Sequence, residues 1–321
     1  MPLFLTEADV RELLPMASAI ERVEASFTAQ HSGQGINRSR QRILAPHASL
    51  HFMAAGLIEE GWFGAKIYTI TRQGFQFVVV LFDASSGALL AVIEADHLGR
   101  IRTGAASGVA TKFMAREDAR RVGLIGAGRQ GITQLEAVTR VRKIEAVRVF
   151  SRDPERRRAF CRDAAERLKI PVEPVETAEA AVRSGDVVIT ATNASEPVAF
   201  GNWIQPGTHL NVIGANMANR REVDSEVLRR ARILAVDSLE QAKIEAGDLI
   251  HGLGPAGRDW DSVAELHAIV AGARPGRESP QDVTLFKSSG IALWDVSVAG
   301  FIYNQALARG RGFPLPASTG N

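Results

Sequence analysis

Residues 126–131, Gly-Ala-Gly-Arg-Gln-Gly, place the strongest constraint on how this chain folds. The apolar run 122–125 leads directly into them, and residues 130–141 continue as a helix. In that context the first glycine permits a tight turn, the second lets the backbone approach a pyrophosphate, and the third allows close packing of helix on strand, while the helix N-terminal amides bind the negative charge. This pattern predicts a dinucleotide-binding loop, the alternative being a Rossmann-like loop without nucleotide. The predicted cofactor contacts are Gly126, Gly128, Arg129, Gln130 and Gly131.

The end of the next candidate strand, 147–150, indicates which nicotinamide cofactor is bound. NAD-binding proteins place an acidic side chain there, which accepts hydrogen bonds from the ribose hydroxyls. Here Ser151 and Arg152 follow the strand, and a hydroxyl and a guanidinium can bind a 2′-phosphate by charge-assisted hydrogen bonds. We therefore expect NADP, with NAD possible. In the alternative, Asp153 turns inward and Arg152 is a surface residue.

Alternation of strands and helices from residue 121 onward predicts a parallel sheet covered on both faces. The region before it differs: Thr6 with Asp9 can cap a first helix, and three later runs predict an antiparallel meander. A segment rich in small residues, 96–115, predicts a closely packed connecting helix, and an apolar helix at about 291–308 is expected to return to the first domain. The predicted class is α/β, a Rossmann doubly wound parallel sheet plus an α+β domain. The candidate strands are 62–71, 75–83 and 88–95 in the meander, and 122–125, 147–150, 187–192, 209–213 and 233–236 in the parallel sheet.

Composition excludes several other classes of protein. A single cysteine, Cys161, allows no internal disulfide or thiolate cluster, and we interpret it as a helical residue. His47 and His51 lack a carboxylate at matching spacing, so no metal site is predicted. The formal net charge is +2, and arginines alternate with acids, which indicates solvated helix faces and no nucleic-acid or membrane partner. Without a recognisable signal peptide or an apolar run of about 18 residues, a cytoplasmic location is expected.

Three cations in the first domain are candidates for holding a substrate: Arg40, Lys66 and Arg102. Lys66 is the most informative, because it interrupts an otherwise apolar strand, where burying an unpaired charge is costly. Taken singly, each has a simpler interpretation, with Lys66 on a solvent face and Arg102 in a surface ion pair. An oxidoreductase for amino or imino acids, however, needs cations for the carboxylate and a group that exchanges a proton with the nitrogen.

Six stretches in order resemble the ornithine cyclodeaminase and mu-crystallin family over nearly the whole chain. The resemblance implies a homodimer whose first domains join their sheets, with the substrate between that domain and the Rossmann domain. It also implies that Arg40, Lys66 and Arg102 surround the substrate carboxylate and the reacting nitrogen. We accordingly expect a substrate-binding and dimerisation domain at 1–115, completed by 291–321, and a Rossmann domain at 116–290. The stretches are 64–66 (Gly-Ala-Lys), 81–83 (Leu-Phe-Asp), 101–106 (Ile-Arg-Thr-Gly-Ala-Ala), 125–128 (Ile-Gly-Ala-Gly), 211–216 (Asn-Val-Ile-Gly-Ala-Asn) and 284–288 (Thr-Leu-Phe-Lys-Ser). The remaining predicted cofactor contacts are Thr192, Asn193, Lys287 and Ser288.

One departure from the family pattern concerns the reaction. Cyclodeaminases place an aspartate where this chain has Asn216. The amide of asparagine cannot act as a base, but it can orient an ammonium or imine group. The resemblance therefore points to ketimine reductases and amino-acid dehydrogenases, in which hydride passes between nicotinamide and the C=N carbon. Lys66 and Asn216 are the predicted catalytic residues, with Lys66 or a water supplying the nitrogen proton. Ornithine cyclodeaminase itself and a non-catalytic mu-crystallin-like binding protein are the alternatives, and cyclic and open-chain imines are equally open as substrates.

Overall fold

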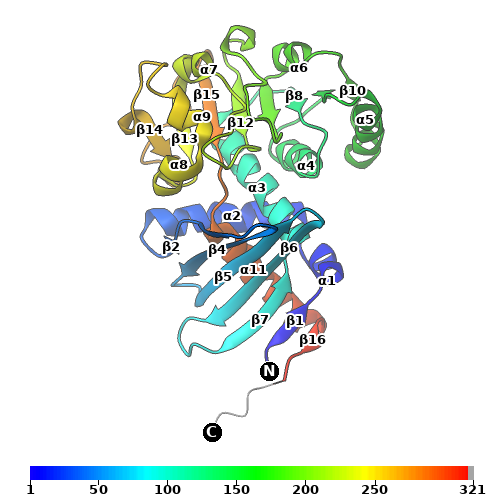
Figure 1. Cartoon of the computed structure of the whole chain (residues 1–321), viewed down its shortest axis with the longest axis vertical. Helices are drawn as coiled ribbons and strands as arrows, with labels where there is room; N and C mark the ends of the chain where they lie inside the picture. Colours follow the sequence, from blue (N-terminus) through cyan, green and yellow to red (C-terminus); the bar gives the residue numbers. More distant parts are fainter. Residues whose placement is uncertain (317–321) are drawn as a thin grey trace. The chain divides into compact units, whose positions relative to one another are not determined.

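The computed structural model describes residues 1–316 and divides the chain into two compact units (Figure 1). The first unit contains residues 1–102 and the described residues from 291 onward, and the second unit contains residues 103–290. Helix α3 (Asp96–Met114) supplies residues to both. The chain has the mixed α/β class predicted, with a parallel sheet in the second unit.

The sheet of the first unit has the strand order β16-β1-β7-β6-β5-β4-β2, with β3 paired to β4. Antiparallel pairing of β5, β6 and β7 confirms the predicted meander. The other strands were not predicted. Four have only two to four residues, and β4, Ala-Ser-Leu-His-Phe-Met-Ala-Ala-Gly-Leu, contains many residues of low strand propensity. The bounds are β1 (Leu3–Leu5), β2 (Gly35–Asn37), β3 (Gln41–Leu44), β4 (Ala48–Leu57), β5 (Trp62–Thr71), β6 (Gly74–Asp83), β7 (Leu89–Glu94) and β16 (Phe313–Pro314).

Helices α1 (Glu7–Leu13), α2 (Met16–His31) and α11 (Ala292–Arg309) belong to the first unit. The predicted cap of α1 is confirmed, since Thr6 and Asp9 exchange hydrogen bonds in a capping box. Helix α11 packs on β4 and β5. The face of the sheet that it covers is called the covered face, and the opposite face is called the open face. Lys66 lies on the covered face, because its neighbour at i−2, Gly64, would bring an added Cβ within 3.4 Å of the Val296 side chain of α11.

The second unit contains a parallel sheet with the order β10-β9-β8-β11-β12-β15-β13-β14. All five strands predicted for it are present, whereas β10, β14 and β15 were not predicted. Neighbouring residues of β8 belong to different apolar clusters, Leu124 on one face and Ile125 on the other, so both faces are covered as expected. The bounds are β8 (Arg121–Ile125), β9 (Ala146–Phe150), β10 (Val172–Pro174), β11 (Val187–Thr190), β12 (His209–Val212), β13 (Ala231–Val236), β14 (Val263–Glu265) and β15 (Val283–Lys287).

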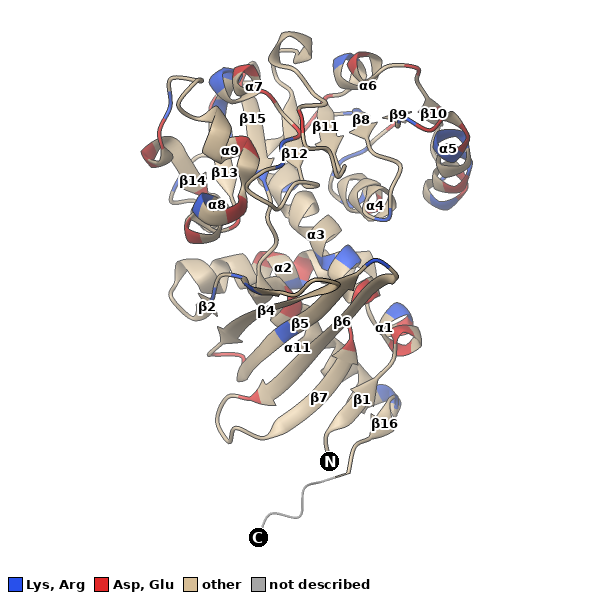
Figure 2. Cartoon of the chain, viewed as in Figure 1, with Lys and Arg blue, Asp and Glu red and all other residues tan. Residues whose placement is uncertain are grey.

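Seven further α-helices lie in the second unit. Cys161 is a buried helical residue of α5, as interpreted from the sequence, and burial raises the pKa of its thiol to about 11. Figure 2 shows basic and acidic residues side by side along α5, in keeping with a solvated helix face. The bounds are α4 (Gly131–Val141), α5 (Pro154–Leu168), α6 (Ala178–Ser184), α7 (Ser225–Arg230), α8 (Leu239–Glu245), α9 (Gly247–Gly252) and α10 (Leu266–Val270).

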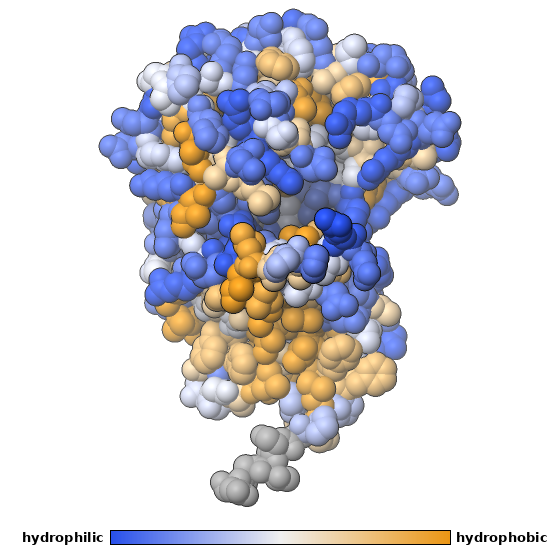
Figure 3. Space-filling view, in the orientation of Figure 1, coloured by the Kyte–Doolittle hydropathy of each residue, from blue (hydrophilic) through white to orange (hydrophobic). Residues whose placement is uncertain are grey.

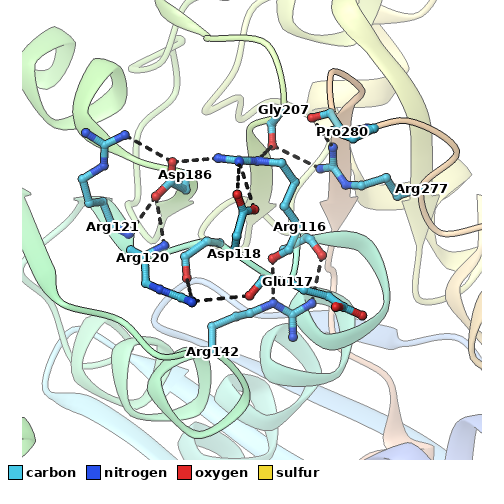
Figure 4. A network of polar contacts seen from close by, with 12 residues as sticks. Arg116, Glu117, Asp118, Arg120, Arg121, Arg142, Asp186, Gly207, Arg277 and Pro280 are labelled. Carbon is cyan, nitrogen blue, oxygen red and sulfur yellow. Dashed lines mark hydrogen bonds and ion pairs between the residues drawn. The ribbon is translucent and has the colours of Figure 1, made fainter.

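Arginines from distant segments hold the end of α3 within the second unit (Figure 4). Arg142 donates to the carbonyls of Ala115 at 2.8 Å and Arg116 at 2.8 Å, and Arg277 donates to the carbonyl of Met114 at 2.9 Å. Carbonyls at the C-terminal end of a helix receive no hydrogen bond from within the helix, and here the guanidinium groups donate to them. Arg116 in turn pairs with Asp186, which anchors the start of the parallel sheet.

Candidate functional site

The glycine-rich loop has the geometry expected of a dinucleotide-binding turn. Gly126 has a φ of +115°, which only glycine adopts readily, and an added Cβ would lie 2.5 Å from the carbonyl oxygen of Ala191. A Cβ added to Gly128 would meet little, since the nearest side-chain atom is an Arg156 nitrogen 4.0 Å away. Gly131 packs against Phe160, whose Cζ would lie 3.1 Å from an added Cβ. The three glycines therefore provide the turn, the open backbone and the close packing that a bound pyrophosphate requires.

Helix α4 begins at Gly131 without a side-chain cap. The Gly131 amide donates to the Gly128 carbonyl at 3.1 Å, so the amides that follow it in the first turn are the ones suited to an anion. Arg129 is exposed and Gln130 is partly buried at this helix start. Sequence reasoning missed Arg156, in the first turn of α5. Its Nε donates to the carbonyl of Ala127 at 3.1 Å, which places the guanidinium beside the loop. A cation here is suited to a phosphate group.

Asp153, which follows the end of β9, is the N-cap residue of α5. Its Oδ1 accepts hydrogen bonds from the amides of Glu155 and Arg156 and so caps α5. The Asp153 carboxylate is therefore engaged by the helix that follows β9. Ser151 is partly buried, with its hydroxyl donating to the Asp153 carbonyl at 3.2 Å, and Arg152 is exposed.

A buried carboxylate, Glu222, joins the loops that follow β11 and β12. Its Oε1 accepts from the amide and the hydroxyl of Thr192 at 2.7 and 2.8 Å, and its Oε2 accepts from the amides of Gly214 and Ala215 at 2.5 and 3.2 Å. Burial raises the pKa of Glu222. Sequence reasoning missed this residue. Asn193 follows Thr192 and is exposed, whereas Thr192 is partly buried.

Lys287 and Ser288, predicted as cofactor contacts, lie inside the fold. The Lys287 ammonium lies 2.9 Å from a carboxylate oxygen of Asp248 and donates to the carbonyl of Ala215 at 2.5 Å. The Ser288 hydroxyl donates to Asp237 at 3.0 Å. Both side chains therefore have partners inside the second unit, and the Lys287 ammonium holds a backbone carbonyl. Asn216, half-buried, follows directly after the segment that Lys287 and Glu222 hold.

The first unit brings two of the predicted substrate cations together. Lys66 on β5 and Arg102 on α3 both meet Asp295 in the first turn of α11, with the Lys66 Nζ at 2.7 Å and the Arg102 Nε at 3.0 Å from the same oxygen, Oδ1. The exposed fractions of Lys66, Arg102 and Asp295 are 3%, 7% and 0%. The interpretations of Lys66 as solvent-facing and of Arg102 as a surface ion pair are therefore wrong. Asp295 was missed, although a carboxylate inside an apolar helix is a signal that the sequence carries.

Arg40 and two aromatic rings complete this cluster. Arg40 is buried, and its Nη2 donates to the sulfur of Met53 at 3.9 Å. The Lys66 ammonium lies 5.4 Å from the ring centre of Phe77, and the Arg102 guanidinium 5.6 Å from that of Trp294. Burial lowers the pKa of Lys66 to about 8, an effect that Asp295 opposes and that Arg102 and Arg40 reinforce.

The histidine pair considered for a metal has a different setting. The His51 ring stacks on Tyr68 with centroids 4.6 Å apart, and its Nε2 lies 2.8 Å from the hydroxyl of Ser49. Across residues 1–316, no three His, Cys, Asp or Glu side chains group as a metal would require. No helix in that same range has the length and apolar character needed to cross a membrane.

Comparison with known proteins agrees with these features. The model of the ornithine cyclodeaminase/mu-crystallin family matches residues 1–310. Delta(1)-pyrroline-2-carboxylate reductase of Bacillus cereus is 40% identical over 260 residues, which are 78% of this chain and 79% of the relative.

Two solved structures share the whole architecture. That of Thermococcus litoralis Delta(1)-pyrroline-2-carboxylate reductase with NADH and L-proline superimposes with a TM-score of 0.94 and 36% identity, covering 98% of this chain and 100% of the other. An archaeal alanine dehydrogenase dimer with bound NAD has a TM-score of 0.92 and 32% identity, covering 98% and 99%. With a family model that spans nearly the whole sequence and relatives of this similarity, the chain belongs to the ornithine cyclodeaminase/mu-crystallin family.

Proposed function

We propose that this protein is an NADP-dependent oxidoreductase that transfers hydride between nicotinamide and the C=N or CH–NH group of a small imino or amino acid. The observation that carries the proposal is the buried cluster of Lys66, Arg102 and Asp295 in a chain that also has a complete dinucleotide-binding loop. The relatives are reductases of an imino acid and a dehydrogenase of an amino acid, which supports the same reaction class.

The charges of the cluster suit a substrate with one carboxylate. Lys66, Arg102 and Arg40 contribute three positive charges, and Asp295 offsets one of them when all are ionised. The buried cluster therefore keeps an excess of positive charge, which a substrate carboxylate would reduce. We assign Arg102 and Arg40 to the carboxylate, because guanidinium groups bind carboxylates through paired hydrogen bonds.

Lys66 is assigned to proton exchange at the substrate nitrogen. A pKa of about 8 lets its amine both donate and accept a proton near neutral pH, which is the property that a general acid or base needs. When bound, the nicotinamide cofactor would supply or accept the hydride. Asn216 is assigned to orienting the nitrogen, since its amide can donate and accept hydrogen bonds but cannot remove a proton. This assignment favours a reductase over a cyclodeaminase.

The preference for NADP rests on the end of β9. Asp153 caps α5, and Ser151, Arg152 and Arg156 bring a hydroxyl and two cations to the region next to the loop. In that setting a 2′-phosphate gains charge-assisted hydrogen bonds. The pyrophosphate is assigned to the backbone of residues 126–131 and the start of α4. Thr192 and Asn193 are assigned to the nicotinamide side, while Lys287 and Ser288 act from inside the fold on the loops that carry these contacts.

The open face of the first unit's sheet supports the proposal of a homodimer. Figure 3 shows apolar side chains gathered over the strands of this sheet. On this face Phe52 and Phe63 are exposed, and Phe63 stacks on Phe82 with centroids 6.1 Å apart. A contiguous apolar face of this kind marks an interaction surface, and a second copy of the chain is the proposed occupant. The archaeal alanine dehydrogenase relative is itself described as a dimer.

The function is tested with a panel of imines and NADPH absorbance as the readout. The panel contains pyrroline-2-carboxylate as a cyclic imine, and pyruvate with ammonia or methylamine as open-chain imines. Oxidation of NADPH that depends on one of them, and its loss in Lys66→Met, is the expected result. Release of ammonia from ornithine without imine reduction would identify a cyclodeaminase. Binding of NADPH with no turnover of any imine would identify a non-catalytic binding protein.

A further inference from the structure

Asp295 has an unusual position, because one oxygen of its carboxylate contacts both candidate cations. Its Oδ1 lies 2.7 Å from the Lys66 Nζ and 3.0 Å from the Arg102 Nε, although the three residues come from β5, α3 and α11. The other oxygen, Oδ2, is buried and accepts no hydrogen bond from residues 1–316. All hydrogen bonds of this carboxylate therefore serve Lys66 and Arg102.

Stability alone is a poor explanation for this arrangement. A buried ion pair loses much of its attraction to desolvation, and well-packed apolar side chains in its place are often equally or more stable. A buried carboxylate kept for stability is also expected to satisfy both of its oxygens. The arrangement instead leaves two N–H groups of Lys66 and the Nη atoms of Arg102 without a hydrogen bond to Asp295.

Helix α3 leaves room for the ammonium at this place. A Cβ added to Gly99 would lie 2.9 Å from the Lys66 Nζ, too close for a methyl group to fit without moving the lysine. Phe77 of the neighbouring strand lies on another side, with 5.4 Å between its ring centre and the ammonium. The position of the Lys66 amine is thus defined by α11, α3 and β6 together.

We propose that Asp295 is a positioning residue, whose Oδ1 holds the Lys66 ammonium and the Arg102 guanidinium at a set separation, so that one binds the substrate carboxylate while the other meets its nitrogen. This inference rests on the proposed function and deepens it. Positioning of this kind matters for catalysis, because displacing a catalytic group by about 1 Å can reduce the rate by a factor on the order of a hundred.

The charge of Asp295 has a second consequence, for the proton. The charged groups that face Lys66 are Asp295 from α11, Arg102 from α3 and Arg40 from the segment before β3. Burial lowers the pKa of Lys66, the two arginines lower it further, and Asp295 is the acid that raises it. Removing the negative charge of Asp295 therefore lowers the pKa of Lys66 below its present value of about 8.

The test is Asp295→Asn, which keeps the shape of the side chain and removes its charge. We expect kcat for imine reduction at pH 7 to fall about tenfold or more, and the alkaline limb of kcat/KM to move by about one pH unit or more toward lower pH. The loss of kcat/KM between pH 7 and pH 9 then grows from about tenfold to about fiftyfold. Ser297→Ala is the matched control, because Ser297 is buried on the same helix and donates to the Arg22 carbonyl. It should keep the native profile.

Gly99→Ala tests the same idea without changing a charge, and it covers the case in which Asp295→Asn does not fold. Alanine favours a helix over glycine, so the backbone of α3 tolerates the change. Its methyl group displaces the Lys66 ammonium from Asp295, and we expect a lower kcat with the alkaline limb again at lower pH.

Each result bears on one proposal only. A folded Asp295→Asn enzyme, or in its absence a Gly99→Ala enzyme, with native kcat and a native pH profile would overturn the role of Asp295 and leave the reductase function intact. A native protein that reduces none of the imines would overturn the function itself, before any variant is compared.

Discussion

The pH dependence of the reaction in its two directions is the sharpest test of Lys66. Burial lowers the pKa of this lysine from 10.5 to about 8, against the opposing effect of Asp295. Imine reduction needs the protonated ammonium, so kcat/KM should be level below pH 8 and fall about tenfold per pH unit above it. Activity at pH 10 should then be about a hundredth of the level at pH 7. Amine oxidation needs the neutral amine, so its rate should rise up to about pH 8 and then level off.

The assay follows NADPH absorbance from pH 6 to pH 10 with the best imine, and NADP reduction with the corresponding amino acid. Lys66→Met is the control, because methionine keeps much of the length of the side chain but cannot ionise. Its kcat should fall by roughly a hundredfold or more, the usual scale of a lost acid or base. Ionisation of the substrate itself occurs with both enzymes, so only the limb that disappears in the variant belongs to Lys66. A near-native kcat in Lys66→Met, or an alkaline limb that this variant retains unchanged, refutes the assignment and leaves water as the proton source.

Three further predictions concern binding and assembly. Arg102→Ala should raise KM for the imine roughly tenfold to a hundredfold, with a smaller effect on kcat, because it removes a charged hydrogen bond to the carboxylate; steady-state kinetics measure both. Ser151→Asp should reverse a preference for NADPH over NADH, since a carboxylate repels the 2′-phosphate; equal affinities of the native protein for both cofactors in fluorescence titrations would contradict the role of Ser151 and Arg152. Phe63→Arg should convert a dimer into monomers by placing a charge on the open face of the sheet; light scattering that finds the native chain monomeric at micromolar concentration would dismiss this interface.

Much of the fold could be predicted because long elements carry their own pattern. Strands β5 and β6 are rich in β-branched and aromatic residues, and β7 is an aliphatic run. The predicted strands of the parallel sheet are short apolar runs next to helices. Strands such as β10, Val172–Pro174, have three residues and owe their conformation to the pairing partner. No local pattern can indicate a strand that exists because a neighbour supplies its hydrogen bonds.

The site divides in the same way between local and distant information. The dinucleotide-binding loop could be predicted, because its three glycines act within six residues of sequence. Glu222 could not, since its carboxylate acts on Thr192, thirty residues earlier, and its importance depends on burial that only the fold shows. Lys287 carried a recognisable motif, but the direction of its side chain toward Asp248 depended on the packing of the sheet.

Asp295 shows that a distant contact can still leave a trace in sequence. Lys66 interrupts an apolar strand and Asp295 interrupts an apolar helix, and each charge alone would be destabilising in a buried element. The two are separated by 229 residues, yet each supplies what the other lacks. Two unmatched charges of opposite sign in two segments that are expected to be buried therefore predict a pair, because leaving both unpaired would be more destabilising than bringing them together. The first turn of α11 adds a reason for the acid to be there, since the partial positive charge of a helix N-terminus favours a carboxylate at that end.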